Sequence, residues 1–215
     1  NGTYPFVRSD VYVLNRTNLY AGGVSGQIIP LYTNGATQVP MISYNTNDPN
    51  LYLVRHYSGR LTNSETSEIY GALQLFRLSG SFDSETITTL TNMPTYDPWS
   101  FLPSTANFAP QSNTTVRVMN NDSRMHSVVY RNGYLWCAQT VFLPYDGPTH
   151  SAVQWWQITT NGTMVQAGRI NDDASVEYCA FPSLSVNRFN DVLIGYSMFS
   201  TNYYASAAYA FRSFN

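Results

Sequence analysis

The chain has 215 residues, a net charge of −2, and 15% aromatic but only 11% charged residues. This length is enough for one large or two small domains with a sizeable core. All 11 basic residues are Arg, and the slightly acidic balance excludes the basic surface that a nucleic-acid partner requires. No apolar run approaches the roughly 20 residues needed to cross a bilayer, so we expect no membrane insertion.

The first 35 residues predict three short strands separated by turns that contain glycine or asparagine. These strands are Tyr4–Val7, Asp10–Leu14 and Gln27–Tyr32. A longer unit then begins, in which Pro40–Tyr44 and Leu51–Tyr57 predict a hairpin. A polar loop to Glu68 follows, and two further strands are predicted at residues 72–77 and 85–90.

The second unit is centred on the stretch from Ser127 to Ile158. Ser127–Arg131 and Tyr134–Ala138 flank Asn132-Gly133, the dipeptide that best supplies the two positive-φ positions of a type I′ turn. Branched and aromatic residues at Ala152–Ile158 predict a third strand, and Thr163–Ile170 predicts a fourth. The sequence therefore predicts four antiparallel strands in this unit.

The third unit has the same order but ends earlier. Pro182–Asn187, Asp191–Tyr196 and Ala207–Arg212 predict three strands, and no fourth strand follows. A phrase of the form Ala-x-x-x-aromatic-Arg/Gln begins at residues 72, 152 and 207.

Repeated four-stranded units with two apolar faces are typical of propeller blades, which bury those faces against each other. We therefore predict an all-β fold, a partial β-propeller of about three to four blades that forms one domain over residues 1–215. The alternative is a β-sandwich, which also has short, regularly spaced strands. Three and a half blades cannot close a ring, so we expect this segment to belong to a larger propeller or to half of an assembly.

Residues 91–123 are rich in proline and predict an insertion loop between blades, because prolines interrupt a regular ladder. Such loops lie on one face of a propeller, where ligands bind. Trp99 in this loop either contacts a ligand or anchors the loop to the body. Trp155 and Trp156 point to opposite faces of a strand, so at most one of them stacks on a ligand.

The strongest candidate binding residues cluster around the start of the second unit. Arg124, His126, Tyr130 and His150 together suit a carboxylate or a sugar, with Arg124 as a bidentate fork. The alternative is that these side chains tie down loop carbonyls. The full set of candidate ligand-binding residues is Arg124, His126, His150, Tyr130, Trp99 and Trp155.

The sequence contains no recognisable catalytic motif, metal motif or phosphate-binding loop. Sialidase-like propellers carry Ser-x-Asp-x-Gly-x-Thr-Trp boxes, and this chain has none. We therefore predict no catalytic residue, no metal site and no cofactor.

The two cysteines, Cys137 and Cys179, both lie in predicted strands outside any CxxC motif. They form either a disulfide between neighbouring sheets or two buried free thiols, which behave as small hydrophobic groups.

Two stretches resemble blades of large secreted bacterial proteins of uncharacterised function. One is Phe181–Ser197 with Tyr209–Arg212, and the other is Val129–Trp136 with His150–Trp156. The resemblance covers roughly residues 120–213 and implies an extracellular propeller whose ring continues into further segments. It implies no catalytic residue.

These observations favour a secreted or cell-surface binding module, with a glycan or a protein at the loop face and further blades or a second copy as partners. Five Asn-x-Ser/Thr triplets are consistent with a possible glycoprotein, and the chain begins with Asn rather than Met, so we expect it to be a longer or processed chain. Two alternatives remain. One is part of a glycoside-processing enzyme with its catalytic carboxylates elsewhere, and the other is a structural component of a surface assembly.

Overall fold

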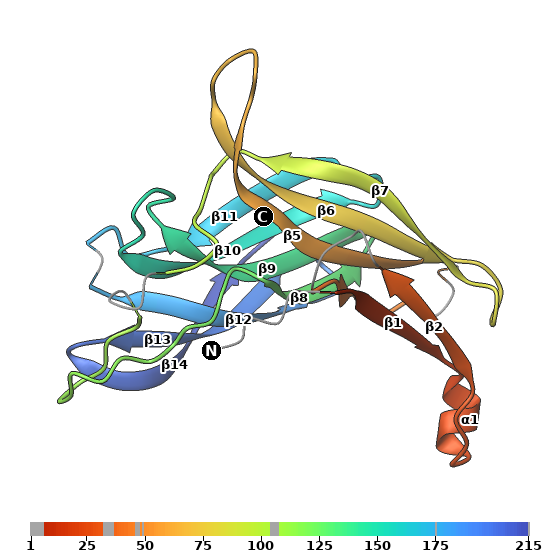
Figure 1. The fold of residues 1–215 in the computed structure, drawn as a ribbon. Helices are drawn as coiled ribbons and strands as arrows, with labels where there is room; N and C mark the ends of the chain where they lie inside the picture. The colour runs from red at the N-terminus through yellow and green to blue at the C-terminus, as the bar shows by residue number, and fades with distance from the viewer. Residues whose placement is uncertain are drawn as a thin grey trace.

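The computed structural model describes residues 7–31, 37–45, 48, 50–103, 108–174 and 176–214. Nearly all of its regular structure is β-strand, which confirms the all-β prediction (Figure 1). The predicted strand at Tyr4–Val7 lies almost entirely outside the described residues. The elements are β1 (Ser9–Leu14), α1 (Arg16–Tyr20), β2 (Gly26–Leu31), β3 (Val39–Pro40), β4 (Ile42–Ser43), β5 (Leu51–Thr62), β6 (Ile69–Ser79), β7 (Thr86–Thr95), β8 (Met125–Arg131), β9 (Tyr134–Leu143), β10 (His150–Thr159), β11 (Met164–Ile170), β12 (Tyr178–Val186), β13 (Val192–Ser200) and β14 (Tyr203–Arg212).

The three predicted units form three separate sheets. The first sheet has the order β3-β5-β6-β7, the middle sheet β4-β8-β9-β10-β11, and the last sheet β12-β13-β14. Consecutive strands pair in antiparallel fashion, and the phrase beginning at residues 72, 152 and 207 falls on β6, β10 and β14. β10 and β14 are the third long strands of their sheets, whereas β6 is the second long strand of its own, because β3 has only two residues. A small β1-β2 hairpin forms a sheet of its own, and its Val11, Val13 and Ile29 pack against Leu53, Phe76 and Leu78 of the first sheet.

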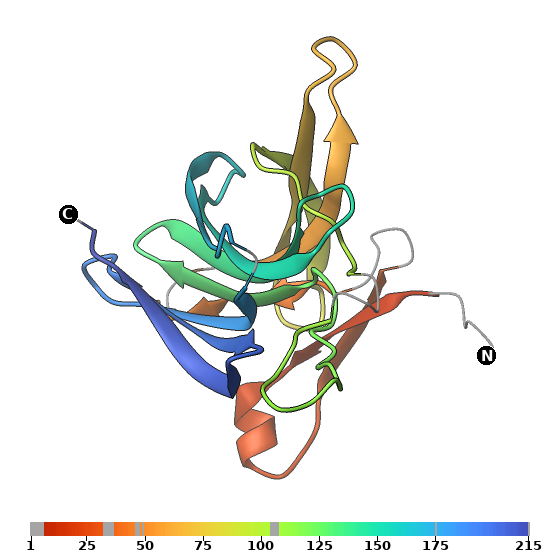
Figure 2. The same ribbon diagram turned by 90° about the vertical axis from the view of Figure 1, so that its left-hand side faces the viewer.

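The three sheets lie face to face, with the middle sheet between the other two (Figures 1 and 2). Side chains alternate along a strand, so β9 and β10 send one set of residues to each neighbouring sheet. The core between the first and middle sheets includes Val54, Leu73, Leu75, Leu135, Cys137, Trp156 and Ile158. The core between the middle and last sheets includes Val129, Trp136, Val153, Cys179, Leu184 and Ile194. The middle sheet is therefore buried on both faces.

The predicted hairpin at Asn132-Gly133 is confirmed. The turn residues have φ values of 49° and 84°, the left-handed conformation of a type I′ turn. β8 and β9 pair directly across this turn, from Arg131 opposite Tyr134 to Val128 opposite Cys137. The dipeptide therefore fixes the register of the middle sheet.

The prediction of a hairpin between residues 40–44 and 51–57 is only partly correct. Pro40 pairs with Leu53 of β5, but Ile42 then pairs with Val129 in a parallel bridge between β4 and β8. The segment crosses from the first sheet to the middle sheet within two residues. This crossing is possible because β3 and β4, the edge strands of the two sheets, are only two residues long.

The predicted start of the insertion loop at residue 91 is wrong, because β7 continues to Thr95. Leu73 pairs with Met93, and Ala72 pairs with Pro94. β7 is an edge strand, and proline is accepted there because its missing N–H can face away from the ladder. Residues 96–103 and 108–123 contain only isolated bridges, at Ser100 and at Ala109 with Val118.

The indole of Trp99 is a wedge between the first and middle sheets. It is fully buried and lies 5.6 Å from the ring of Trp156. On the other side it fills a slot left by two glycines, since a Cβ on Gly59 or Gly71 would lie 2.8 Å or less from its ring atoms. Trp99 therefore anchors the loop to the body, the second of the two roles considered for it.

We expect Gly71→Ala to destabilise the fold by about 1–3 kcal/mol, because its Cβ would lie 2.1 Å from Cζ3 of Trp99. Urea unfolding measures the change. Gly195→Ala is the matched control in β13, where a Cβ would meet nothing within 4 Å. Equal stability of the two variants would contradict the wedge.

Both cysteines are buried free thiols, so the disulfide alternative is wrong. Cys137 faces the first sheet, whereas Cys179 packs in the core on the opposite face of the middle sheet. A sheet therefore separates them. Burial raises the pKa of both thiols, and that of Cys179 is raised to about 11.

The urea-unfolded chain should take up two alkyl groups without any reductant, since no S–S bond consumes the thiols. The native chain should react slowly, because burial keeps both thiols protonated. Intact mass after iodoacetamide treatment checks both points. Labelling that depends on reductant would indicate a bridge.

Candidate functional site

The antiparallel order brings one set of loops to a single end of the molecule. β5, β7, β9, β11 and β13 finish at this loop end, and β6, β8, β10, β12 and β14 begin there. Figure 2 views the molecule from this side. The segments at the loop end include residues 63–68, 144–149 and the described parts of 96–124 and 171–177.

Two hollows lie side by side at the loop end, and Tyr145 lines both. The larger has a volume of about 420 Å³ and is lined by Pro98, Leu143, Pro144, Tyr145, His150, Arg169, Asn171 and Asp173. The smaller, of about 380 Å³, is lined by His56, Tyr57, Ser58, Gly59, Arg60, Trp99, Ser100, Phe101 and Tyr145. We refer to the two together as the loop-end groove.

Arg169 is the most unusual residue of this groove. Its Nε donates a hydrogen bond to Oε1 of Gln154, but its Nη2 is buried and has no hydrogen-bond partner among the described residues. Burial lowers the pKa of Arg169, and the charge of Asp97 opposes this effect. An arginine stays charged even so. A buried cationic N–H group without an acceptor calls for one from outside the chain.

His150, one of the predicted binding residues, lies in the wall of the larger hollow. Its Nε2 lies 2.8 Å from Oδ1 of Asn171, and its Nδ1 lies 3.1 Å from Oγ1 of Thr149. The carbonyl oxygen of Asn171 can only accept, so Nε2 donates to it, while the Thr149 hydroxyl lies within reach of both Nδ1 and the Leu143 carbonyl oxygen. These bonds hold the ring against Tyr178, whose centroid is 6.3 Å away.

His56 is held between two aromatic residues of the loop. Trp99 Nε1 donates to His56 Nδ1 at 3.3 Å, and the Phe101 ring lies 4.8 Å away. Burial, followed by the positive charge of Arg55, lowers the pKa of His56 to about 4, while Asp122 opposes the shift. His56 is therefore neutral near pH 7, and its unprotonated Nδ1 accepts the hydrogen bond from Trp99.

Arg124 cannot make the predicted bidentate contact with a ligand, because the N–H groups that it would use are already paired. Its Nε and Nη2 each donate to a carboxylate oxygen of Asp122 at 2.7 Å, and Asp122 also accepts from the Arg124 backbone N–H. This pair lowers the pKa of Asp122 despite its burial. His126 is half-buried beside Phe181, and its Nε2 has no described partner. Both residues support the loop end without lining the groove.

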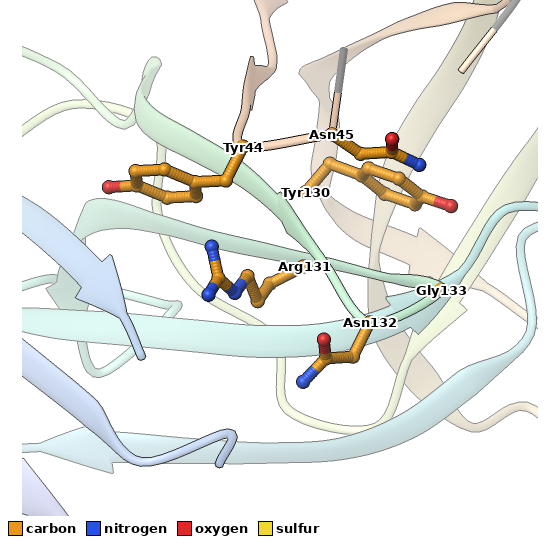
Figure 3. A pocket seen from close by; sticks show the side chains of 6 residues that line it. All are labelled: Tyr44, Asn45, Tyr130, Arg131, Asn132 and Gly133. Carbon is orange, nitrogen blue, oxygen red and sulfur yellow. The ribbon is translucent and has the colours of Figure 1, made fainter. Parts of the chain in front are cut away.

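Two of the predicted site residues lie elsewhere. Tyr130 lines a hollow of about 280 Å³ at the opposite end, where Figure 3 shows Tyr44, Tyr130 and Arg131 around it. The Arg131 guanidinium lies 4.8 Å from the Tyr44 ring. Trp155 stacks on Trp136 between the middle and last sheets, with centroids 6.2 Å apart. Of the predicted set, only His150 and Trp99 line the groove.

Three carboxylates around the groove, those of Asp146, Asp172 and Asp173, already have structural partners. Asp172 accepts backbone N–H groups of Ala174, Val176 and Glu177, which lower its pKa. Asp173 accepts from Asn171, and Asp146 lies 3.7 Å from Arg60. Among the residues that the structure describes, no three His, Cys, Asp or Glu side chains are grouped to hold a metal ion.

Sequence reasoning missed His56, Arg60, Tyr145 and Arg169. None of them belongs to a motif, and they come from three different segments: β5, the loop before β10, and β11. The only available signal was the alternating direction of consecutive strands. This alternation places the ends of β5 and β11 at the same end of the molecule as the loop before β10. That signal requires the strand boundaries to be known first.

Comparison with known protein families finds no match for this chain, and no curated protein matches it. None of the described helices is long and apolar enough to span a membrane.

The pKa of His56 makes stability depend on pH. The unfolded chain takes up a proton near pH 6.5 and the folded chain only near pH 4, so stability is lost as the pH falls through this window. Between pH 7 and 4.5 we expect the unfolding free energy of His56→Gln to fall by about 2 kcal/mol less than that of the wild type. Urea titrations at several pH values measure both, and parallel curves would contradict the assignment.

Proposed function

We propose that this chain is a non-catalytic binding module of the β-propeller type and that its loop-end groove binds a carboxylate-bearing glycan. The observation that carries the proposal is the buried, unpartnered Nη2 of Arg169 in the wall of a hollow of about 420 Å³. A guanidinium prefers a carboxylate oxygen as its acceptor. The groove therefore has a cationic anchor that the fold leaves unsatisfied.

The rest of the groove is suited to a sugar. Tyr145 is a half-buried ring shared by both hollows, and Phe101 is 40% exposed at the far wall. Aromatic faces offer apolar contact to the C–H side of a sugar ring, and the half-exposed guanidinium of Arg60 supplies a polar group. Such a mixture of aromatic walls and few polar groups is typical of small-ligand sites.

The propeller part of the proposal is supported by the stacking of three antiparallel units. A sandwich has two facing sheets, whereas here the middle sheet is covered on both faces by sheets of the same strand order. Blades of a propeller pack in this way. The loop end then corresponds to the ligand-binding face of the ring.

A location outside the cell also belongs to this proposal. Asn113 and Asn161, which begin two of the Asn-x-Ser/Thr triplets, are exposed on the surface. Exposed acceptor residues of this kind are what glycosylation in a secretory route requires.

We expect an array of sialylated and uronic-acid glycans to retain the protein, and the matching neutral glycans to retain it at least tenfold less. Arg169→Gln should weaken binding of the best acidic glycan by about ten- to a hundredfold, since it removes a charged hydrogen bond. Arg131→Gln at the opposite end is the control and should bind as the wild type does.

Thermal unfolding should first establish that both variants are folded. An array without any bound acidic glycan, or equal binding by Arg169→Gln and the wild type, would overturn the proposal. Turnover of a chromogenic glycoside by the purified chain would instead favour an enzyme.

A further inference from the structure

The loop-end groove consists of two hollows that meet at one side chain. Tyr145 lines both the hollow of about 420 Å³ and the hollow of about 380 Å³. The chain also passes directly from one hollow to the other, because Pro98 lines the larger hollow and the next residue, Trp99, lines the smaller. Each hollow alone lies near the lower end of the range of about 300–1,000 Å³ that is typical of ligand pockets. The two together therefore suit a ligand of two linked units.

Tyr145, the residue at the boundary, is supported by β5. The guanidinium carbon of Arg60 lies 5.1 Å from the centre of the Tyr145 ring. Nη1 of Arg60 also lies 3.7 Å from Oδ1 of Asp146, the residue that follows Tyr145. One arginine of β5 thus contacts two consecutive residues of the loop before β10. A ring that is positioned before the ligand arrives loses little conformational entropy on binding, so Tyr145 is a suitable platform for a sugar.

The larger hollow is the place for an acidic group. Among the described residues that line either hollow, Arg169 has the only buried cationic N–H group without a hydrogen-bond partner. The carboxylate of Asp173, in the same hollow, accepts a hydrogen bond from Asn171 and does not satisfy this group. A carboxylate from a ligand does so at a lower cost than leaving the group unpaired. An acidic sugar therefore belongs in the larger hollow.

The smaller hollow is aromatic, and its charge is already balanced. Tyr57 and Phe101, which line it, are each 40% exposed, and Tyr145 is a third ring. Among the described residues that line this hollow, Arg60 has the only permanent charge, and it is paired with Asp146. A second carboxylate would compete with Asp146 for Arg60, whereas a neutral sugar can pack its C–H face on an aromatic ring. The smaller hollow therefore suits a neutral sugar.

We propose that the loop-end groove has two sugar subsites of fixed order, an acidic subsite in the larger hollow and a neutral subsite in the smaller one. Tyr145 lies at the boundary and contacts both sugars. The ligand is thereby an acidic sugar linked to a neutral sugar, and Phe101 is a specificity-determining residue because it lines the neutral subsite alone. This inference rests on the proposed function, since Arg169 must bind the carboxylate.

Calorimetric titration of the full chain with matched sugars tests the order of the subsites. The single acids are the methyl glycosides of N-acetylneuraminic acid and of glucuronic acid. The acid–neutral probes are sialyllactose and cellobiouronic acid, and the acid–acid probes are disialic acid and diglucuronic acid. In the series that binds, the acid–neutral probe should bind about tenfold more tightly than the single acid, because the neutral sugar adds contacts in the smaller hollow. The acid–acid probe should show no such gain.

Three variants assign the two subsites. Phe101→Ala should lower the affinity for the acid–neutral probe to about that of the single acid. Phe82→Ala is the matched control, since Phe82 is 41% exposed in the turn after β6, at the opposite end of the molecule, and it should bind as the wild type does. Arg169→Gln should weaken binding of the single acid and of the acid–neutral probe alike. Thermal unfolding first establishes that the variants are folded, and the comparison of probes on the wild type depends on none of them.

The outcomes separate this inference from the proposed function. Equal affinity for the single acid and the acid–neutral probe, or tighter binding of the acid–acid probe, overturns the order of the subsites. If Arg169→Gln still weakens binding in that case, the carboxylate anchor is retained. Unchanged binding of the acid–neutral probe by Phe101→Ala overturns the neutral subsite. A wild type that binds no acidic probe overturns both proposals.

Discussion

The middle sheet is buried on both faces, and the rest of the structure depends on this burial. β9 and β10 must supply two apolar surfaces, and the sheets on either side must match them. The wedge formed by Trp99 is the tightest point of contact, since its ring occupies the space that side chains at Gly59 and Gly71 would fill. Through this wedge, a loop that has no regular ladder becomes a fixed part of the molecule.

The same wedge organises the polar groups at the loop end. Trp99 donates to His56, and burial beside it keeps His56 neutral. Asp122 pairs with Arg124, and the carboxylates after β11 accept N–H groups of their own loop or its neighbours. The loop end therefore uses most of its polar groups to hold itself together. Arg169 is the exception in the groove, because its Nη2 has no described acceptor, and for this reason the proposed ligand is an acid.

The three sheets differ in how their outer strands are completed. β7 and β11 finish the first and middle sheets, and the prolines and charges of the edge strands limit further pairing. Among the described residues the last sheet consists of β12, β13 and β14, and Tyr209 and Phe211 of β14 are exposed.

The sequence by itself determined the all-β class, the hairpin at Asn132-Gly133 and the order of the three units, because turn chemistry and side-chain alternation are local properties. It also limited Trp155 and Trp156 to opposite faces. Tertiary structure alone decided which polar residues share a site, since His56, Tyr145 and Arg169 come together only when separate sheets stack. It also decided that Cys137 and Cys179 stay apart and that Arg124 is already paired. These outcomes depend on which face of a sheet each side chain meets, and no local pattern encodes that.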